Sequence, residues 1–205
     1  CLLIIDKNIS SFQFIKVDRK MPKPDRFKPT RKKAGPQVRK RQTRSVSKPP
    51  AKKELTLWDQ ASRWYDSLVG GQGTDFQKDI IMPGVFRLLD IKKKDHILDL
   101  ACGQGVFSRY LSQKGVRVEG LDSSSELLKY ARLRSGSSIK YHVGDAGDDK
   151  NFEANRFDGI ASLMAIQNIE RMDLLFKSAA HWLKPEKCFV VVMTHPCFRI
   201  PRQSH

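Results

Sequence analysis

Cysteine is scarce in this sequence, and long apolar runs are absent. The four cysteines, Cys1, Cys102, Cys188 and Cys197, show no CxxC spacing within 205 residues. Such usage indicates neither a disulfide framework nor a metal site, and it is typical of a reducing compartment. No apolar segment approaches the ~18 residues of a membrane span, and the run at 2–5 is too short for the core of a signal peptide. We therefore expect a cytoplasmic protein with no membrane partner.

Acidic residues are nearly missing from the first quarter of the chain. Residues 1–53 hold 17 Lys and Arg against 3 Asp and Glu, and the whole chain has a net charge of +16. Large apolar residues are also rare from 21 to 53, so this segment cannot bury enough surface to offset the entropy lost on ordering. We predict a basic, disordered tail over 1–53 and a folded domain over 54–205. Without aromatic residues among the charges after residue 28, the tail predicts only weak contact with RNA.

The first 20 residues differ from the rest of the tail because they carry two apolar segments. Residues 2–5 and 12–17 could pair as strands, but a fragment boundary explains them as well, and we assign them no function. From residue 54 the composition becomes globular. Apolar spacing predicts helices over 58–68 and 76–89, with Pro83 kinking or restarting the second. Their aromatic residues, Trp58, Trp64 and Tyr65 among them, are expected to be mainly core.

Strands and helices alternate through the remainder of the chain. The predicted strands are 97–100, 116–121, 139–143, 157–163 and 188–193, and the segments between them include helices over 106–114, 125–133 and 172–183. This alternation predicts an α/β fold with a doubly wound, mostly parallel sheet. The strand at 188–193 is continuously apolar, which is typical of a strand buried on both faces.

A glycine turn directly after the first of these strands is the clearest functional signal. Gly103 and Gly105 lie between strand 97–100 and helix 106–114, where glycine lets a ligand approach the main chain closely. Three acids, Asp99, Asp122 and Asp145, stand at or near the ends of successive strands, where open parallel sheets bind ligands. The sequence therefore predicts a site for a nucleotide-like cofactor.

Two cofactor classes are compatible with a glycine turn and a strand-end acid. A dinucleotide would use Asp122 for its ribose, but Ser108 replaces the third glycine of the G-x-G-x-x-G pattern. Asp99 also has no use beside a pyrophosphate. A carboxylate fits better beside the ammonium group of an amino acid, because opposite charges stabilise one another. The pattern thus favours a cofactor with a methionine moiety.

Residues 97–105 resemble the first motif of class I S-adenosylmethionine-dependent methyltransferases. Residues 120–123 and 144–146 are similar to the family's ribose- and adenine-binding turns, and residues 157–163 resemble its fourth strand. This resemblance covers about 54–198 and implies a Rossmann-like methyltransferase fold with S-adenosyl-L-methionine as cofactor. It implies cofactor contacts at Asp99, Ala101, Gly103, Gly105, Asp122, Ser123, Asp145, Ala146 and Ser162. Residues 64–66 resemble an aromatic–acid lid, with Tyr65 near the cofactor carboxylate.

The resemblance has one large departure. Family members continue past the fifth strand into a helix and a β-hairpin whose last strand lies beside it, and this sequence shows no such hairpin. Either the chain is a fragment, which leaves the apolar edge of strand 188–193 uncovered, or another segment covers this edge. We favour the fragment, and we therefore expect a domain that is incomplete at its C-terminus, binds the cofactor without turnover and self-associates. His195 could act as a general base and Arg199 or Arg202 could hold an anionic substrate, but we favour a proline-rich connecting loop as the explanation for this segment. Cys102 is expected to be a packing residue.

Three functions remain open from the sequence. The leading one is methyl transfer to an unidentified, small-molecule acceptor, with no catalytic residue assigned. The second is an RNA methyltransferase recruited by the basic tail. The third is a cofactor-binding module without catalysis.

Overall fold

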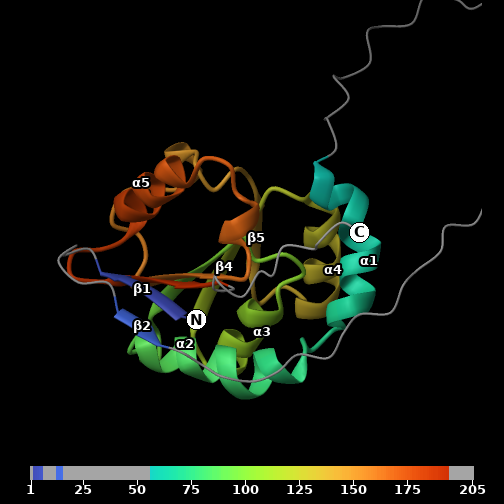
Figure 1. The fold of residues 1–205 in the computed structure, drawn as a ribbon. Coiled ribbons are helices and arrows are strands. Elements are labelled where there is room, and N and C mark those ends of the chain that lie inside the picture. The colour runs from blue at the N-terminus through green and yellow to red at the C-terminus, as the bar shows by residue number, and fades with distance from the viewer. Residues whose placement is uncertain (1, 7–12, 16–55, 194–205) are drawn as a thin grey trace, which may run out of the picture. The chain divides into compact units, whose positions relative to one another are not determined.

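In the computed structural model of the chain, residues 2–6, 13–15 and 56–193 are described, the first two segments by their backbone alone. Seven strands form one sheet in the order β2-β1-β7-β6-β3-β4-β5 (Figure 1). Five of them are parallel, and these are β3 (His96–Leu100), β4 (Arg117–Asp122), β5 (Lys140–Val143), β6 (Gly159–Leu163) and β7 (Cys188–Val192). The predicted doubly wound, mostly parallel α/β fold is confirmed.

The helices begin and end where local chemistry favours it. They are α1 (Leu57–Val69), α2 (Met82–Leu88), α3 (Val106–Gln113), α4 (Ser125–Ser135) and α5 (Met172–Trp182), with short helical turns at Gln77–Ile81, Asp149–Asn151 and Ile166–Asn168. Thr56 and Asp59 form a reciprocal capping box at the start of α1, and Pro83 stands in the first turn of α2. No helix within 56–193 is long and apolar enough to cross a bilayer.

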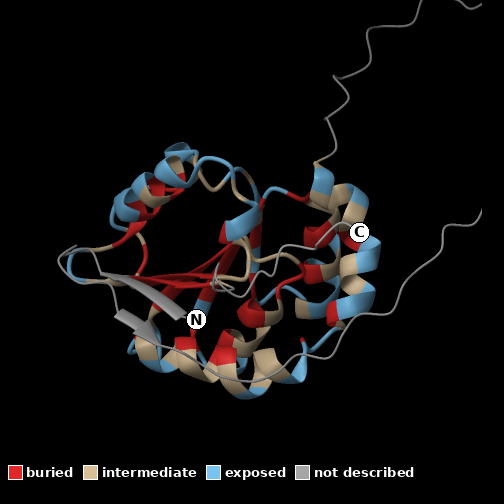
Figure 2. Ribbon diagram, in the orientation of Figure 1, coloured by how far each residue is buried: buried red, intermediate tan, exposed pale blue. Residues whose placement is uncertain are grey.

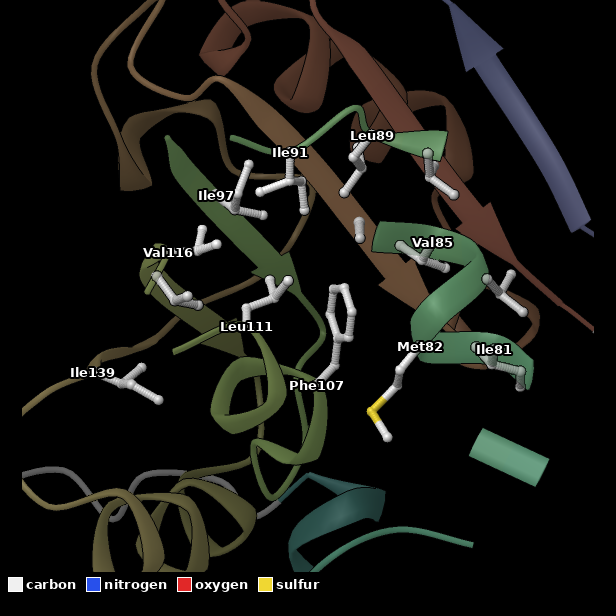
Figure 3. Packing of buried hydrophobic residues seen from close by; sticks show 14 of the residues in the cluster. Ile81, Met82, Val85, Leu89, Ile91, Ile97, Phe107, Leu111, Val116 and Ile139 are labelled. Carbon is white, nitrogen blue, oxygen red and sulfur yellow. The ribbon is translucent and has the colours of Figure 1, made fainter. Parts of the chain in front are cut away.

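Each face of the parallel strands carries its own apolar core. Helices α2, α3 and α4 pack over one face, where Val85 and Leu111 are fully buried (Figure 3). Leu128 of α4 is fully buried in the same core. Helix α5 covers the other face through Leu175 and Trp182. Figure 2 shows the burial concentrated in the sheet and on the helix sides that face it. Because both faces are covered, these strands read as continuous apolar runs.

The β7 edge is covered, contrary to the expectation from the sequence. Strand β1 (Leu2–Asp6) lies antiparallel beside β7, with Leu3 opposite Val191, and β2 (Gln13–Ile15) pairs with β1 in turn. An apolar edge with unpaired amides and carbonyls can accept a strand from any distance along the chain. The expected uncovered edge was therefore wrong, and with it the basis for predicting self-association.

The same pairing corrects the expected boundary of the tail. Residues 2–6 and 13–15 belong to the sheet, so the predicted disordered segment 1–53 does not hold over these strands. The interpretation of residues 2–5 and 12–17 as pairing strands is confirmed for the paired positions. The basic residues between 17 and 53 lie outside the described residues.

Candidate functional site

The carboxyl ends of four parallel strands open into one cavity of about 290 Å³. The loops after β3, β4, β5 and β6 all contribute to its wall. This end of an open parallel sheet brings successive loops to one place. Helix α1 closes one side with Trp58 and Tyr65, whose rings meet edge to face with their centroids 5.5 Å apart. The cavity therefore lies between the sheet's loops and a helix that precedes the first parallel strand.

The turn after β3 presents main chain, rather than side chains, to the cavity. Ala101 and Gly103 both adopt the left-handed conformation, with φ of 57° and 55°, and both line the wall. A Cβ atom at Gly103 would lie 3.8 Å from the Tyr65 ring and 4.0 Å from Leu127, which are wall residues themselves. Glycine at 103 therefore leaves space in which a ligand can approach the backbone.

Gly105 has a different role from Gly103. It also has a positive φ, 75°, but it does not line the described cavity. A Cβ atom here would collide with the Tyr141 hydroxyl and lie 3.1 Å from the Cβ of Ala131. The close packing of the turn against α4 and β5 requires glycine at 105, and the structure places this residue behind the wall.

Asp122 is the last residue of β4, and its carboxylate is held on the wall. Oδ2 accepts a hydrogen bond of 2.7 Å from the Gly103 amide, and Oδ1 accepts one of 2.8 Å from the Ser124 amide. Burial raises the pKa of Asp122, while these two amides oppose the rise. A carboxylate has about four acceptor positions. Two therefore remain for ligand hydroxyls, as expected for a ribose-binding acid.

Asp99 stands one residue before the end of β3, and its surroundings differ. It is 2% exposed, it accepts a hydrogen bond of 2.5 Å from the Ser108 hydroxyl, and it is not among the described wall residues. Burial raises the pKa of Asp99 to about 7, although Ser108 lowers it and Asp122 raises it further. The carboxyl group joins β3 to α3 beneath the glycine turn. The structure does not place it at the wall, where contact with a methionine moiety was expected.

The turn at 144–146, which the resemblance implies for adenine, lies on the wall. Asp145 and Ala146 both line the cavity, and Asp145 Oδ1 accepts a hydrogen bond of 2.6 Å from the Gly147 amide, which shapes the turn. Ser123 also lines the cavity. Ser162, in contrast, is fully buried in β6 and is not among the described wall residues. Its hydroxyl has no hydrogen-bond partner in the part of the chain that the structure describes.

The structure thus brings most of the predicted site together and leaves three residues behind the wall. The predicted residues that line the cavity are Ala101, Gly103, Asp122, Ser123, Asp145 and Ala146. Those that do not are Asp99, Gly105 and Ser162. Asp99 and Gly105 support the wall from within, Asp99 through its hydrogen bond from Ser108 of α3 and Gly105 through close packing against Tyr141 and Ala131.

The three residues of the predicted lid, 64–66, lie in three different surroundings. Tyr65 lines the cavity, and burial together with Asp122 and Asp99 raises its pKa. Asp66 instead forms a two-bond ion pair with Arg134 of α4, at 2.5 and 2.8 Å. Trp64 is 63% exposed, so the expectation that it is a core residue was wrong.

Helix α1 is fastened to α4 at both ends. Near its start, Asp59 Oδ1 accepts hydrogen bonds from the Ser124 hydroxyl at 2.8 Å and from the Glu126 amide at 3.0 Å. Burial raises the pKa of Asp59, but the hydrogen bonds from Glu126, Ser124 and Thr56 outweigh it and lower the pKa to about 2. Near its end, Asp66 pairs with Arg134. These contacts hold Trp58 and Tyr65 against the cavity.

The motifs in the sequence do not predict the second half of the wall. This half includes Gln77, Met82, Leu163, Met164, Asn168, Glu170 and Arg171. Most of these residues lie in the irregular segment between β6 and α5, which has no periodicity that a sequence pattern could detect. Met164 adopts a left-handed conformation with φ of 56°. Methionine is not typical of that conformation, so the residue type gave no signal of the turn.

One further candidate, Cys102, can be placed. Cys102 lines the cavity, and burial, with Asp99 and Asp122, raises the pKa of its thiol well above the ordinary range. A protonated thiol is a poor nucleophile, which agrees with a packing role. His195, Arg199 and Arg202 lie outside the described residues.

The wall fits a nucleoside carrying a methionine moiety better than a dinucleotide. The bare backbone at Gly103 leaves room beside the turn, and the nearby charged wall residues, Asp122 and Asp145, are acids. Acids favour hydroxyl donors and a cationic group, and they oppose a pyrophosphate. Asp122, Asp145 and the 101–103 backbone are therefore the groups that would hold such a cofactor.

Comparisons with known proteins agree with this geometry. Residues 97–186 match the family described as "Methyltransferase domain". The ubiquinone biosynthesis O-methyltransferase of Xylella fastidiosa is 32% identical over 92 residues, which are 43% of this chain and 37% of that protein. The chain spans less than half the length of the curated relatives it matches.

Solved structures show the same fold. The PH0226 protein of Pyrococcus horikoshii is 27% identical with a TM-score of 0.59, covering 70% of this chain and 65% of that one. A phosphoethanolamine N-methyltransferase of Haemonchus contortus, solved with S-adenosyl-L-methionine, is 27% identical with a TM-score of 0.56, covering 66% of this chain and 33% of that one. Together with the order of the motifs along the sheet, these matches show that residues 97–186 carry a methyltransferase domain, similar to those of the class I, S-adenosylmethionine-dependent enzymes.

Proposed function

We propose that this protein transfers the methyl group of S-adenosylmethionine to a small organic acceptor. The observation that carries the proposal is that a single cavity is lined by two different sets of residues. One wall holds Gly103, Asp122 and Asp145, and the other is made by α2 and the segment after β6. A cofactor against the first wall leaves the second for an acceptor.

The residues of the first wall would bind and orient the cofactor. The main chain at 101–103 allows close approach, and the two free acceptor positions of Asp122 suit a pair of ribose hydroxyls. The turn at Asp145 and Ala146 would face the base. The bound cofactor supplies an electrophilic methyl group, and the protein contributes position and orientation, which are large effects in a two-substrate reaction.

The second wall supports a small acceptor rather than a polymer. It combines apolar side chains, such as Met82 and Met164, with the amides of Gln77 and Asn168 and the charges of Glu170 and Arg171. Small-molecule sites typically have this composition, mostly apolar with a few polar groups that fix orientation. The names of the relatives differ in the atom methylated, an O-methyltransferase of ubiquinone biosynthesis and a phosphoethanolamine N-methyltransferase, so the acceptor atom stays unassigned.

Two measurements on the whole chain test the proposal. Calorimetry should show that S-adenosylhomocysteine binds and that NADH does not. Incubation with methyl-labelled S-adenosylmethionine and a cell extract should then label a product that passes a small-pore filter and survives nuclease. Label retained on RNA would indicate the alternative RNA methyltransferase, and tight binding without any transfer would indicate a cofactor-binding module.

A further inference from the structure

Gln77 lies on the cavity wall, and its side-chain amide is held in one orientation. Its Oε1 atom accepts a hydrogen bond of 2.9 Å from the Thr74 amide, and its own backbone amide donates one of 3.3 Å to the Thr74 hydroxyl. Because a backbone amide can only donate, the oxygen of the Gln77 side chain must face Thr74. Within the described part of the chain, no group accepts a hydrogen bond from Nε2. Its two N–H groups can therefore donate to a ligand in the cavity.

The loop before Gln77 brings this amide beside the start of α3. Gly73 is buried with a positive φ of 83°, and a Cβ atom there would lie 2.8 Å from Val106 Cγ1 and 3.0 Å from Gln77 Oε1. Val106 is the first residue of α3 and also lines the cavity. The same loop is bonded to the glycine turn, since Gln104 Nε2 donates to the Gly70 carbonyl at 3.1 Å. Gln77 therefore stands at the end of the cavity where α3 begins.

Positive charge is concentrated at this end of the cavity. Arg109 of α3 donates hydrogen bonds of 2.6 Å to the carbonyls of Gln104 and Gly71. Both partners are neutral, so the guanidinium keeps its charge. Asp99 lies beneath the same turn, but burial raises its pKa to about 7 and so reduces its negative charge at neutral pH. The amides in the first turn of α3 add partial positive charge, and this end therefore favours an anionic group of a ligand.

The rest of the wall is less suited to an anion. Asp122 and Asp145 line it after β4 and β5, and like charges repel. Arg171 is the only cation among the described wall residues, and hydrogen bonds of 3.0 and 2.8 Å to Asp173 already engage its guanidinium. The methionine moiety of S-adenosylmethionine carries one carboxylate, which is the only anionic group of the cofactor. The α3 end is therefore the best place for this carboxylate.

We propose that Nε2 of Gln77 donates a hydrogen bond to the carboxylate of the cofactor's methionine moiety. The proposal rests on S-adenosylmethionine as the cofactor and is independent of the acceptor that takes the methyl group. Gln77 then binds the cofactor from outside the sequence motifs, at the place where the two walls of the cavity meet. Because Thr74 orients the amide in advance, little side-chain entropy is lost when the carboxylate binds.

Calorimetry on the full chain with two ligands tests the proposal. S-adenosylhomocysteine carries the carboxylate, and its decarboxylated form lacks only that group. Gln77→Glu keeps an oxygen that can accept from Thr74 but replaces the N–H donors with a second, negatively charged oxygen. It should weaken binding of S-adenosylhomocysteine by about tenfold to 100-fold and change binding of the decarboxylated ligand by less than about threefold.

Two more variants control for charge and for structure. Gln72→Glu makes the same change at an exposed residue of the same loop that is not among the described wall residues, and the affinity for both ligands should stay within about twofold. Gln77→Leu removes the donors without adding charge, and it should also weaken binding of the carboxylate ligand selectively, by about threefold to tenfold.

Several results would overturn the proposal. Equal loss of affinity for both ligands in the Gln77 variants would mean that the residue only supports the wall. Selective loss in Gln77→Glu but not in Gln77→Leu would show repulsion without a hydrogen bond. Unchanged affinity in both variants would place the carboxylate elsewhere on the wall. If the wild type bound neither ligand, the cofactor assignment itself would fail, and this proposal with it.

Discussion

The ends of β3 and β4 carry two buried acids with opposite surroundings. Asp99 is one residue short of the end of its strand, is 2% exposed and accepts a hydrogen bond from the Ser108 hydroxyl behind the cavity wall. Asp122 is the last residue of its strand, is 8% exposed and accepts hydrogen bonds from two backbone amides on the wall. Since side chains alternate along a strand, one position decides whether an acid supports the site or faces the ligand.

The largest expected effect is the change in the free energy of unfolding with pH that the titration of Asp99 causes. The pKa of Asp99 in the folded protein is about 7, above the ordinary 3.8. Its stability contribution is therefore complete below about pH 4 and is lost as the pH rises through 7, by on the order of a few kcal/mol. Denaturant unfolding of wild type and Asp99→Asn from pH 4.5 to 8 should show the variant gaining relative stability with pH. If the free energies of unfolding of the two proteins changed with pH in parallel, the buried surroundings assigned to Asp99 would be wrong.

Asp122→Asn should weaken binding of S-adenosylhomocysteine between about tenfold and 100-fold, because each charge-assisted hydrogen bond contributes roughly 1.5–3 kcal/mol. Asn keeps the size of the side chain but removes the charge and one acceptor. Calorimetry measures the change, and Asp99→Asn serves as the comparison. If both variants lose affinity equally, the assignment of only Asp122 to the ligand is wrong.

Ser108→Ala should lower stability without lowering affinity. The variant removes the hydroxyl that donates to Asp99, and a buried acceptor left without its partner costs about 1–3 kcal/mol. The midpoint of denaturant unfolding should fall while the dissociation constant for S-adenosylhomocysteine stays within about twofold, as expected for a contact behind the wall. A selective loss of affinity would place Ser108 in the site instead.

Asp145→Asn should have the smallest effect. Asn can still accept the hydrogen bond from the Gly147 amide through Oδ1, so the turn persists. The side chain at 145 is also exposed. We expect an affinity change below about threefold, because an exposed, screened charge contributes little. A change as large as that of Asp122→Asn would move the main cofactor contact from β4 to β5.

The sheet's edge illustrates what sequence patterns leave out. The apolar strand at 188–193 was recognised from composition, and in the structure it pairs in parallel with β6. The strand that covers it comes from residues 2–6, some 185 positions away in the sequence. Periodicity describes which residues can form a strand, but pairing between distant strands depends on which edges are free once the sheet has formed.

The site shows the same division. Local spacing was enough to predict the glycine turn and the acids of β4 and β5, because strand, turn and helix start are set by neighbouring residues. It also suggested residues 64–66 as a lid. It could not show that Trp64 faces outward while Tyr65 faces the cavity, since both fit an apolar period and the acids of α1 find their partners only on α4.

The sequence by itself determined the strand–helix alternation, the glycine turn and the strand-end acids, because each depends on residues within one or two turns of chain. Only the tertiary structure decided the cover of β7 by β1, the inward place of Asp99, and the fully buried Glu119, whose carboxylate meets His96, His142 and Arg156 from three other segments. Such partners are adjacent in space and distant in sequence. Their choice depends on packing and burial, which exist only after the elements assemble.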